Sequence, residues 1–275
     1  MLKTALLLGL LTGILLVIGF LLAGIVGMAL FLILAFILNF AVYWYSDKIV
    51  LRMYKAKEIT EDEESELHEI VKKLAKEAKI PKPKIYLVKM DVPNAFATGR
   101  SPKKGVVAVT SGLIKNLNKD EIEGVLSHEI AHIKSRDTLT SVVAATIAGA
   151  VSYVAFMAWW SLFLGGGRRG GSVLLFPLLI LAPLAATLVR LAISRTREYK
   201  ADYSGSIISK NPLGLASALE KISHAVKNHP MQGNSATSHL FIVNPFKASG
   251  FTNLFSTHPP VENRVARLKE ISKEI

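Results

Sequence analysis

Three long apolar runs divide the chain into apolar and polar segments. The first covers residues 4–45 without one charged residue, and two more cover residues 138–164 and 172–194. A helix rises about 1.5 Å per residue and needs roughly 20 residues to cross a bilayer. The first run is therefore long enough for two spans and each later run for one, which predicts four transmembrane helices with both termini on one side.

Glycines mark the predicted turn between the first two spans. Gly19, Gly24 and Gly27 lie in the middle of the first run, and glycine tolerates the backbone conformations that a tight turn requires. The competing interpretation is a cleaved signal peptide. The run is far longer than the apolar core of such a peptide, and no small-x-small cleavage site stands out.

Basic residues gather at one set of span ends. Lys48, Arg52, Lys134 and Arg195 all fall on the side of the polar segments, whereas the opposite side would hold only the loop "GGGRRGG". Lysine and arginine near span ends favour the cytoplasmic side, so the polar segments and both termini are predicted to be cytoplasmic in a multi-pass protein of the cell membrane. The net charge of +12 suits anionic lipid. Nucleic-acid binding is not expected, because aromatic residues do not interleave with the basic ones.

The first polar segment predicts an amphipathic helix and a small sheet. Within residues 59–80, apolar residues recur at helical spacing: Leu67, Ile70, Val71 and Leu74. Three strands are then expected at residues 84–90, 94–99 and 105–110. The predicted class is α+β and mainly helical.

The stretch "LSHEIAHIKSRD" carries the candidate chemistry. A helix that begins at Asn118, with Glu121 completing a capping box, places His128 and His132 on one face, one turn apart. Two imidazoles at this spacing can bind zinc, with Glu129 as general base toward the water that the metal activates. Without its context, this short pattern also occurs by chance. The chain contains no cysteine, so thiolate ligands and a cysteine nucleophile are excluded.

A third zinc ligand is expected on a second helix. Catalytic zinc needs three protein ligands, and the extension that would place glycine and histidine after the motif is absent, since Ser135 and Thr138 stand there. In "SRTREYKADYSG", Glu198 would bind the metal, and Asp202, four residues later, would accept the free N–H of a ligand histidine. The alternative is that both are solvated acids that pair with nearby basic residues.

The helix with the two histidines is expected to continue unbroken into the third span. No proline and few glycines lie between the two segments. The hairpin of the third and fourth spans would then bring both ligand segments to the cytoplasmic side at similar heights.

These pieces together resemble the HtpX-type membrane-embedded zinc metalloproteases over nearly the whole chain. The matching motifs are "PNAFATG", "LSHEIAHIKSRD", "SRTREYKADYSG" and "STHPPVENRVARL". The resemblance implies a gluzincin-like catalytic domain with one Zn²⁺ per chain, and an endopeptidase that degrades damaged or misfolded membrane proteins or unfolded polypeptides in the lipid bilayer. His258 matches a family motif. It could donate a hydrogen bond to the developing oxyanion or merely end a segment.

The predicted organisation has four parts: residues 1–46 as a transmembrane hairpin, 47–137 as the first part of the catalytic domain, 138–194 as a second hairpin, and 195–275 as the second part of the catalytic domain. A CAAX prenyl-protein endopeptidase would share the zinc core but have more spans. A non-catalytic membrane scaffold would have lost a ligand or the base. Substrates and oligomeric state are left open.

An edge strand is the expected place for substrate. Asn94, Ala95, Phe96 and Ala97 form a short strand without the charges that normally protect an edge, and an extended peptide could add to it. The alternative is that the two alanines simply pack under the helix. Four further histidines have no metal-ligand partner at useful spacing and are expected in surface or packing positions: His68, His224, His229 and His239.

Overall fold

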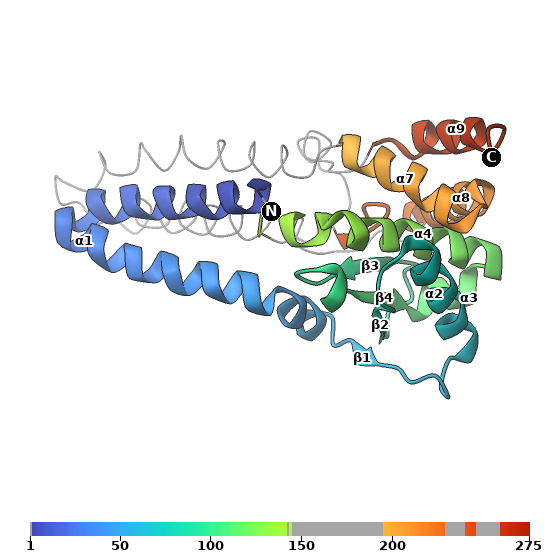
Figure 1. Cartoon of the computed structure of the whole chain (residues 1–275), viewed down its shortest axis with the longest axis horizontal. Helices are drawn as coiled ribbons and strands as arrows, with labels where there is room; N and C mark the ends of the chain where they lie inside the picture. Colours follow the sequence, from blue (N-terminus) through green and yellow to red (C-terminus); the bar gives the residue numbers. More distant parts are fainter. Residues whose placement is uncertain (1, 142, 145–194, 229–239, 246–258) are drawn as a thin grey trace. The chain divides into compact units, whose positions relative to one another are not determined.

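The computed structural model describes residues 2–141, 143–144, 195–228, 240–245 and 259–275 (Figure 1). The predicted third and fourth spans and their loop lie almost wholly outside these residues, as do His229, His239 and His258. The chain divides into two compact units. One comprises Met1–Tyr45 and Thr140–Ile193, and the other comprises Ser46–Leu139 and Ser194–Ile275.

The first unit is built on α1 (Leu2–Met53), which turns back on itself. Ala23 and Gly24 leave the helical conformation, with Gly24 at φ 59°, as the glycine pattern predicted. The segment after the turn, Ala23–Met53, contains an 18-residue window with a mean hydropathy of 2.7 and is long enough to cross a membrane. Most of its large apolar side chains are exposed, which suits a helix covered by lipid rather than by protein.

The two arms of α1 approach closely at the turn. A Cβ on Gly19 would lie 2.5 Å from the carbonyl oxygen of Gly27, and a Cβ on Gly27 would lie 2.1 Å from that of Gly19. Further along, the Asn39 amide donates to the Thr12 hydroxyl at 2.9 Å. The glycines and this polar contact hold the arms together as an antiparallel pair.

The second unit contains a four-stranded mixed sheet. Its strands are β1 (Lys57–Glu58), β2 (Lys84–Val88), β3 (Ala95–Thr98) and β4 (Val106–Thr110). Their order is β1-β2-β4-β3, with β2 and β4 parallel and the outer strands antiparallel to their neighbours. All three predicted strands are present, and the short β1 was not predicted. β3 lies at the edge, beside β4 (Figure 1).

Helices pack on the sheet and against one another. They are α2 (Ser65–Ala78), α3 (Ser111–Asn116), α4 (Lys119–Ser135), α7 (Arg195–Ser209), α8 (Pro212–Asn228) and α9 (Val261–Ile271), with a 3-10 turn at Pro102–Lys104. The predicted amphipathic helix begins at Ser65, six residues later than its pattern, and buries the predicted apolar face. α4 packs against α2, α7, α8 and β3, so it is the central element of this unit.

The start of α4 is fixed as the sequence predicted. Asn118 accepts from the backbone N–H of Glu121, and the Glu121 carboxylate accepts from the backbone N–H of Asn118. The same carboxylate also accepts from Ser217 at 2.6 Å and from Lys221 at 2.9 Å. The capping residue therefore also ties α4 to α8.

The end of α4 corrects the sequence prediction. The helix stops at Ser135, and Arg136 takes a left-handed conformation at φ 58° and ψ 28°. Beyond the break, the Thr138 hydroxyl donates to the carbonyl of Gly99 at 2.9 Å. The expectation of an unbroken helix was wrong because a non-glycine residue makes the break, and neither proline nor glycine marks it in the sequence.

Candidate metal centre

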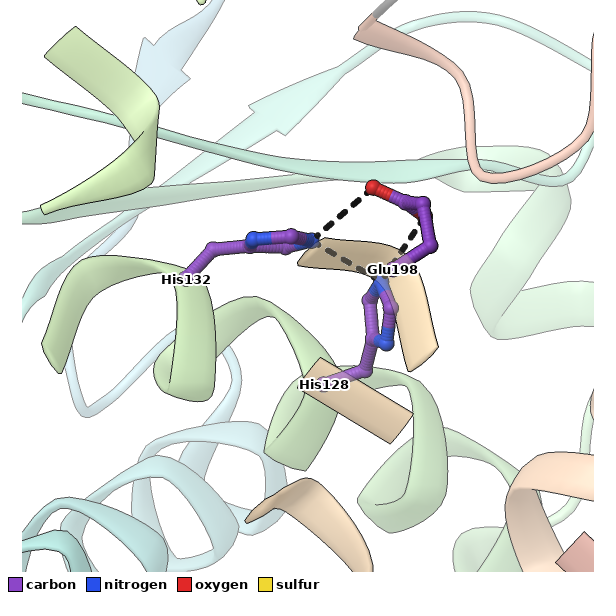
Figure 2. Close-up of side chains that lie close together, drawn as sticks. All are labelled: His128, His132 and Glu198. Carbon is purple, nitrogen blue, oxygen red and sulfur yellow. Dashed lines mark hydrogen bonds and ion pairs between the residues drawn. The ribbon is translucent and has the colours of Figure 1, made fainter. Parts of the chain in front are cut away.

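Three side chains converge between α4 and α7. The Nε2 atoms of His128 and His132 lie 3.1 Å apart, and carboxylate oxygens of Glu198 lie 3.7 Å and 3.4 Å from them (Figure 2). The ligand atoms of this group all lie within 4.8 Å of one another. His128 and Glu198 are buried, and His132 is nearly so. The predicted ligand set is thus brought together in space.

The donor set and its spacing fit zinc. Zinc in proteins binds imidazole nitrogen and carboxylate oxygen at about 2.0–2.2 Å in tetrahedral geometry, which separates neighbouring ligand atoms by roughly 3.4 Å. The three measured separations, 3.1, 3.4 and 3.7 Å, scatter around that value. Only three protein ligands are present among the described residues, as in catalytic rather than structural sites.

The approach of α7 to α4 depends on a glycine. Glu198, Asp202 and Gly205 follow the spacing i, i+4, i+7 on α7, so they share one face. A Cβ on Gly205 would lie 3.0 Å from the backbone nitrogen of His128. Because glycine has no side chain, the two helices come close enough for both acids to reach the histidines of α4.

Asp202 contacts the ring nitrogen of His128 that does not face His132 and Glu198. Its Oδ1 atom lies 2.9 Å from Nδ1 of His128, so Nε2 is the nitrogen that faces Glu198. Burial lowers the pKa of His128 to about 4, which keeps the imidazole neutral and available as a ligand. Burial opposes ionisation of Asp202, but the charge of Arg264 outweighs it and holds the pKa of Asp202 at about 2.

Arg264, on α9, is a site residue that sequence reasoning missed. Its guanidinium is fully buried and donates to both carboxylate oxygens of Asp202, at 2.9 and 2.6 Å. It also lies 3.7 Å from Glu198 and donates to the carbonyl of Ile242 at 3.3 Å. In the sequence, the only sign of its importance is its place in the motif "STHPPVENRVARL". Arg264 and α7 are far apart along the chain, so no local pattern predicts that they are in contact.

Glu129 lies beside the same group and is buried. Burial raises its pKa to about 7, opposed by the charge of His132 and reinforced by that of Glu198. The backbone N–H of Ala97 lies near this carboxylate and acts to lower its pKa. A carboxyl group with a pKa near neutrality can take up and return a proton at physiological pH.

The second histidine has an acidic neighbour as well. Nδ1 of His132 lies 3.6 Å from Asp137, and Asp137 lies 3.8 Å from Arg197. Burial disfavours the charged form of His132. Its interactions with Asp137 and Glu198 outweigh this and raise its pKa to about 10. The interpretation of Glu198 and Asp202 as solvated acids does not hold, since both are buried.

In the predicted substrate-binding segment, residues 94–97, the side chains of Asn94 and Phe96 make contacts within the protein. The Asn94 side chain donates to the carbonyl of Leu240 at 3.1 Å and accepts from the N–H of Ile242 at 3.0 Å, so its amide is used within the chain. Phe96 packs in a buried cluster with Tyr54 and Phe241. These two side chains therefore hold the edge strand in place.

The side chains of Ala95 and Ala97 are buried in the core cluster that includes residues of α4, as the alternative expected, and only their backbone groups lie at the edge of the sheet. The N–H of Thr110 donates to the carbonyl of Asn94 at 2.9 Å, which marks these two residues as a hydrogen-bonded pair. Such pairs alternate along antiparallel strands, so Phe96 is the next residue bonded to β4. The backbone groups of the two alanines point away from β4, and the N–H of Ala97 lies near Glu129.

The described histidines outside the group have packing or surface positions. His68 is buried, and its Nε2 lies 3.1 Å from the carbonyl oxygen of Ile59. His224 is exposed on α8. Both agree with the expectation from the sequence.

Comparison with known proteins identifies the family. Residues 61–272 match the model of peptidase family M48. The chain is 53% identical to "Protease HtpX homolog" of Pyrococcus furiosus, covering 99% of this chain and 96% of that one. It is 49% identical to "Protease HtpX homolog" of Aquifex aeolicus over 96% of this chain and 90% of that one.

Among solved structures, the fold is similar to that of S. mikatae Ste24p. The TM-score is 0.53 at 20% identity, and the match covers 94% of this chain and 62% of the other. At that identity the likeness concerns the fold alone. The family match and the near full-length relatives carry the assignment: the chain belongs to peptidase family M48, among its HtpX-type metalloproteases.

Proposed function

We propose that His128, His132 and Glu198 bind one zinc ion and that Glu129 is the general base for peptide-bond hydrolysis. The observation that carries the proposal is the convergence of three ligand side chains beside a buried glutamate. A zinc ion at this position would polarise the scissile carbonyl and lower the pKa of a water molecule. The alternative function, a non-catalytic membrane scaffold, is not supported, because all three metal ligands and the general base are present.

Glu129 moves the proton in this reaction. Its carboxylate takes a proton from the attacking water and passes it to the leaving amine, and the raised pKa near 7 suits both steps. The backbone N–H of Ala97, in the edge strand, lies near this carboxylate. Asp202 fixes His128 with Nε2 toward the metal, and Arg264 keeps Asp202 charged.

The substrate is proposed to lie as an extended chain along β3. Ala95 and Ala97 present backbone groups at the sheet edge, and backbone pairing demands little of the substrate sequence. The N–H of Ala97 connects that edge to Glu129, which would set the scissile bond beside the base. His258, outside the described residues, remains the proposed hydrogen-bond donor to the developing oxyanion.

The cellular role is proposed to be proteolytic quality control in the membrane. The membrane-capable helix in α1 and the HtpX-type relatives support an enzyme embedded in the bilayer. We propose four spans, a cytoplasmic catalytic domain and cytoplasmic termini from the distribution of basic residues. Damaged or misfolded membrane proteins would then be the substrates, since edge pairing selects extended chain rather than a sequence.

Hydrolysis by a matched pair of variants tests the catalytic assignment. Glu129→Gln keeps the size of the side chain but cannot accept a proton, so cleavage of an unfolded polypeptide should fall about 10²–10⁴-fold while zinc content is unchanged. Glu123→Gln, on the same helix and paired with Lys73 at 2.7 Å, is the control and should cleave normally. A Glu129→Gln enzyme with the wild-type rate would refute the role of Glu129 as base.

A further inference from the structure

We propose that Asp137, held by Arg197, is the positioning residue for the metal ligand His132. This inference rests on the proposed function, because it assumes that His132 binds the metal through Nε2. Nδ1 of His132 lies 3.6 Å from Oδ2 of Asp137, and Nε2 lies 3.4 Å from Glu198. The two ring nitrogens thus face different acids, as required if one binds metal and the other is oriented by a carboxylate.

The left-handed residue at the end of α4 makes this contact possible. Successive residues of a helix are rotated by about 100°, so a residue five positions after His132 on an unbroken helix would face roughly 140° away from it. Arg136, at φ 58° and ψ 28°, ends the helix before Asp137. The turn there redirects the chain and brings the carboxylate back toward the imidazole.

The segment after the turn is anchored, so Asp137 is held in place. Thr138 donates its hydroxyl proton to the carbonyl of Gly99 at 2.9 Å, and Leu139 is buried. Gly99 directly follows β3 and has a φ of 125°, and a Cβ there would lie 2.2 Å from the carbonyl oxygen of Lys104. The position of Asp137 therefore depends on the sheet edge as well as on α4.

Arg197 supplies the opposite charge from the other ligand helix. Its Nε lies 3.8 Å from Oδ1 of Asp137, and it directly precedes Glu198 on α7. The pair therefore links the end of α4 to the start of α7, the two segments that carry the metal ligands.

The first histidine has the same arrangement, in which a carboxylate contacts the imidazole and an arginine contacts the carboxylate. There His128, Asp202 and Arg264 form a buried series, with the side chain of Asp202 only 1% exposed. At His132 the corresponding Asp137 side chain is 20% exposed. Water weakens charge interactions, so Asp137 should contribute less to metal affinity than Asp202, though in the same direction.

Metal binding by the full-length chain in detergent tests the role. Zinc affinity would be measured by competition with a chelating dye, and the visible absorption of the Co²⁺-loaded protein would report ligand geometry. Asp137→Ala should weaken zinc binding about 10–100-fold and change the Co²⁺ bands. Asp137→Asn, whose amide oxygen can still accept from Nδ1, should lose less, and Arg197→Met should lose affinity without removing the acceptor.

The controls separate orientation from folding. Asp120→Asn, an exposed acid at the start of α4, should match the wild type in every measurement. The melting temperature of the metal-free variants should also stay near that of the wild type, because a positioning residue acts through the metal. If Asp137→Ala does not fold, Asp137→Asn and Arg197→Met still decide the question.

Two results would contradict the inference in distinguishable ways. If His128→Ala loses zinc while Asp137→Ala, Asp137→Asn and Arg197→Met bind it with wild-type affinity and the wild-type Co²⁺ spectrum, then Asp137 does not position His132, and the proposed function stands. If the wild-type chain itself binds no stoichiometric zinc, both the inference and the proposed function fail.

Discussion

Arg264 and Asp202 form a two-point charge pair, with bonds of 2.9 and 2.6 Å, in the fully buried interior behind the candidate metal centre. Removal of one partner leaves an uncompensated buried charge. Arg264→Leu should therefore lower the free energy of unfolding by about 3–5 kcal/mol. Thermal unfolding of the metal-free protein in detergent would measure this.

The double variant Asp202→Asn/Arg264→Leu is the control for that prediction. With both charges gone, part of the lost stability should return, although zinc affinity should remain low because His128 has lost its carboxylate partner. If the double variant is less stable than Arg264→Leu alone, the buried-charge explanation is wrong.

The stability of the metal-free protein should depend on pH through Glu129. Burial raises its pKa to about 7, whereas glutamate in unfolded chains titrates near ~4.3. Between these values the folded chain binds the extra proton, so the free energy of unfolding falls as pH rises from about 4 to about 7. Glu129→Gln should be more stable than the wild type above pH 7, by roughly 1–3 kcal/mol, and similar near pH 4.

Thermal midpoints with metal chelated, measured from pH 4 to pH 8, would check this. Glu123→Gln should show no such gain, since it loses a carboxylate paired with Lys73. A Glu129→Gln protein that is less stable than the wild type at pH 8 would show that the Glu129 carboxylate is not disfavoured by burial.

Proline substitutions test the substrate edge. Ala95→Pro removes an N–H that points away from β4, so KM should rise while kcat and zinc content stay near wild type. Because Ala95 is buried in the core, this variant should lose some stability, but less than a proline that also breaks a bond to β4. Ala97→Pro also removes the N–H that lies near Glu129, so kcat should fall as well. Thr98→Pro is the matched control and should destabilise the protein, because Thr98 belongs to a pair bonded to β4.

Peptide-cleavage kinetics and thermal unfolding on the same preparations give all these quantities. Normal KM and kcat in both alanine variants would place the substrate away from β3.

Tags and labels test the proposed topology. Epitopes at Lys48 and Ile275 should be protected in intact cells and accessible after permeabilisation, because both ends are predicted to be cytoplasmic. A membrane-impermeant label should reach a cysteine introduced into residues 165–171 only from outside. Labelling of that loop only from the cytoplasmic side would mean that the second hairpin does not cross the membrane.

Local signals made much of the fold predictable. The capping box at Asn118 and Glu121 and the helical spacing from Leu67 to Leu74 depend on residues a few positions apart. The same is true of Gly24, where the structure places the turn. The spacing of His128 and His132 and that of Glu198 and Asp202 predicted which side chains share a face.

Long-range contacts and one local exception were not predictable. Arg264 reaches Asp202 across 62 residues, and no periodicity encodes that meeting. The break at Arg136 is local, but arginine has no special preference for the left-handed conformation, so the sequence gives no sign of it. The contact between Asp137 and His132 depends on that break and was therefore not predicted, because on an unbroken helix Asp137 would face away from His132.

Zinc content per chain tests the central claim most directly. The full-length wild-type protein, purified in detergent and analysed by mass spectrometry for metals, should contain one zinc equivalent. Glu198→Ala should contain far less, whereas Glu220→Ala, which removes an exposed glutamate paired with Lys269, should match the wild type. One equivalent of zinc in Glu198→Ala, or none in the wild type, would contradict the assignment of His128, His132 and Glu198 as the metal centre.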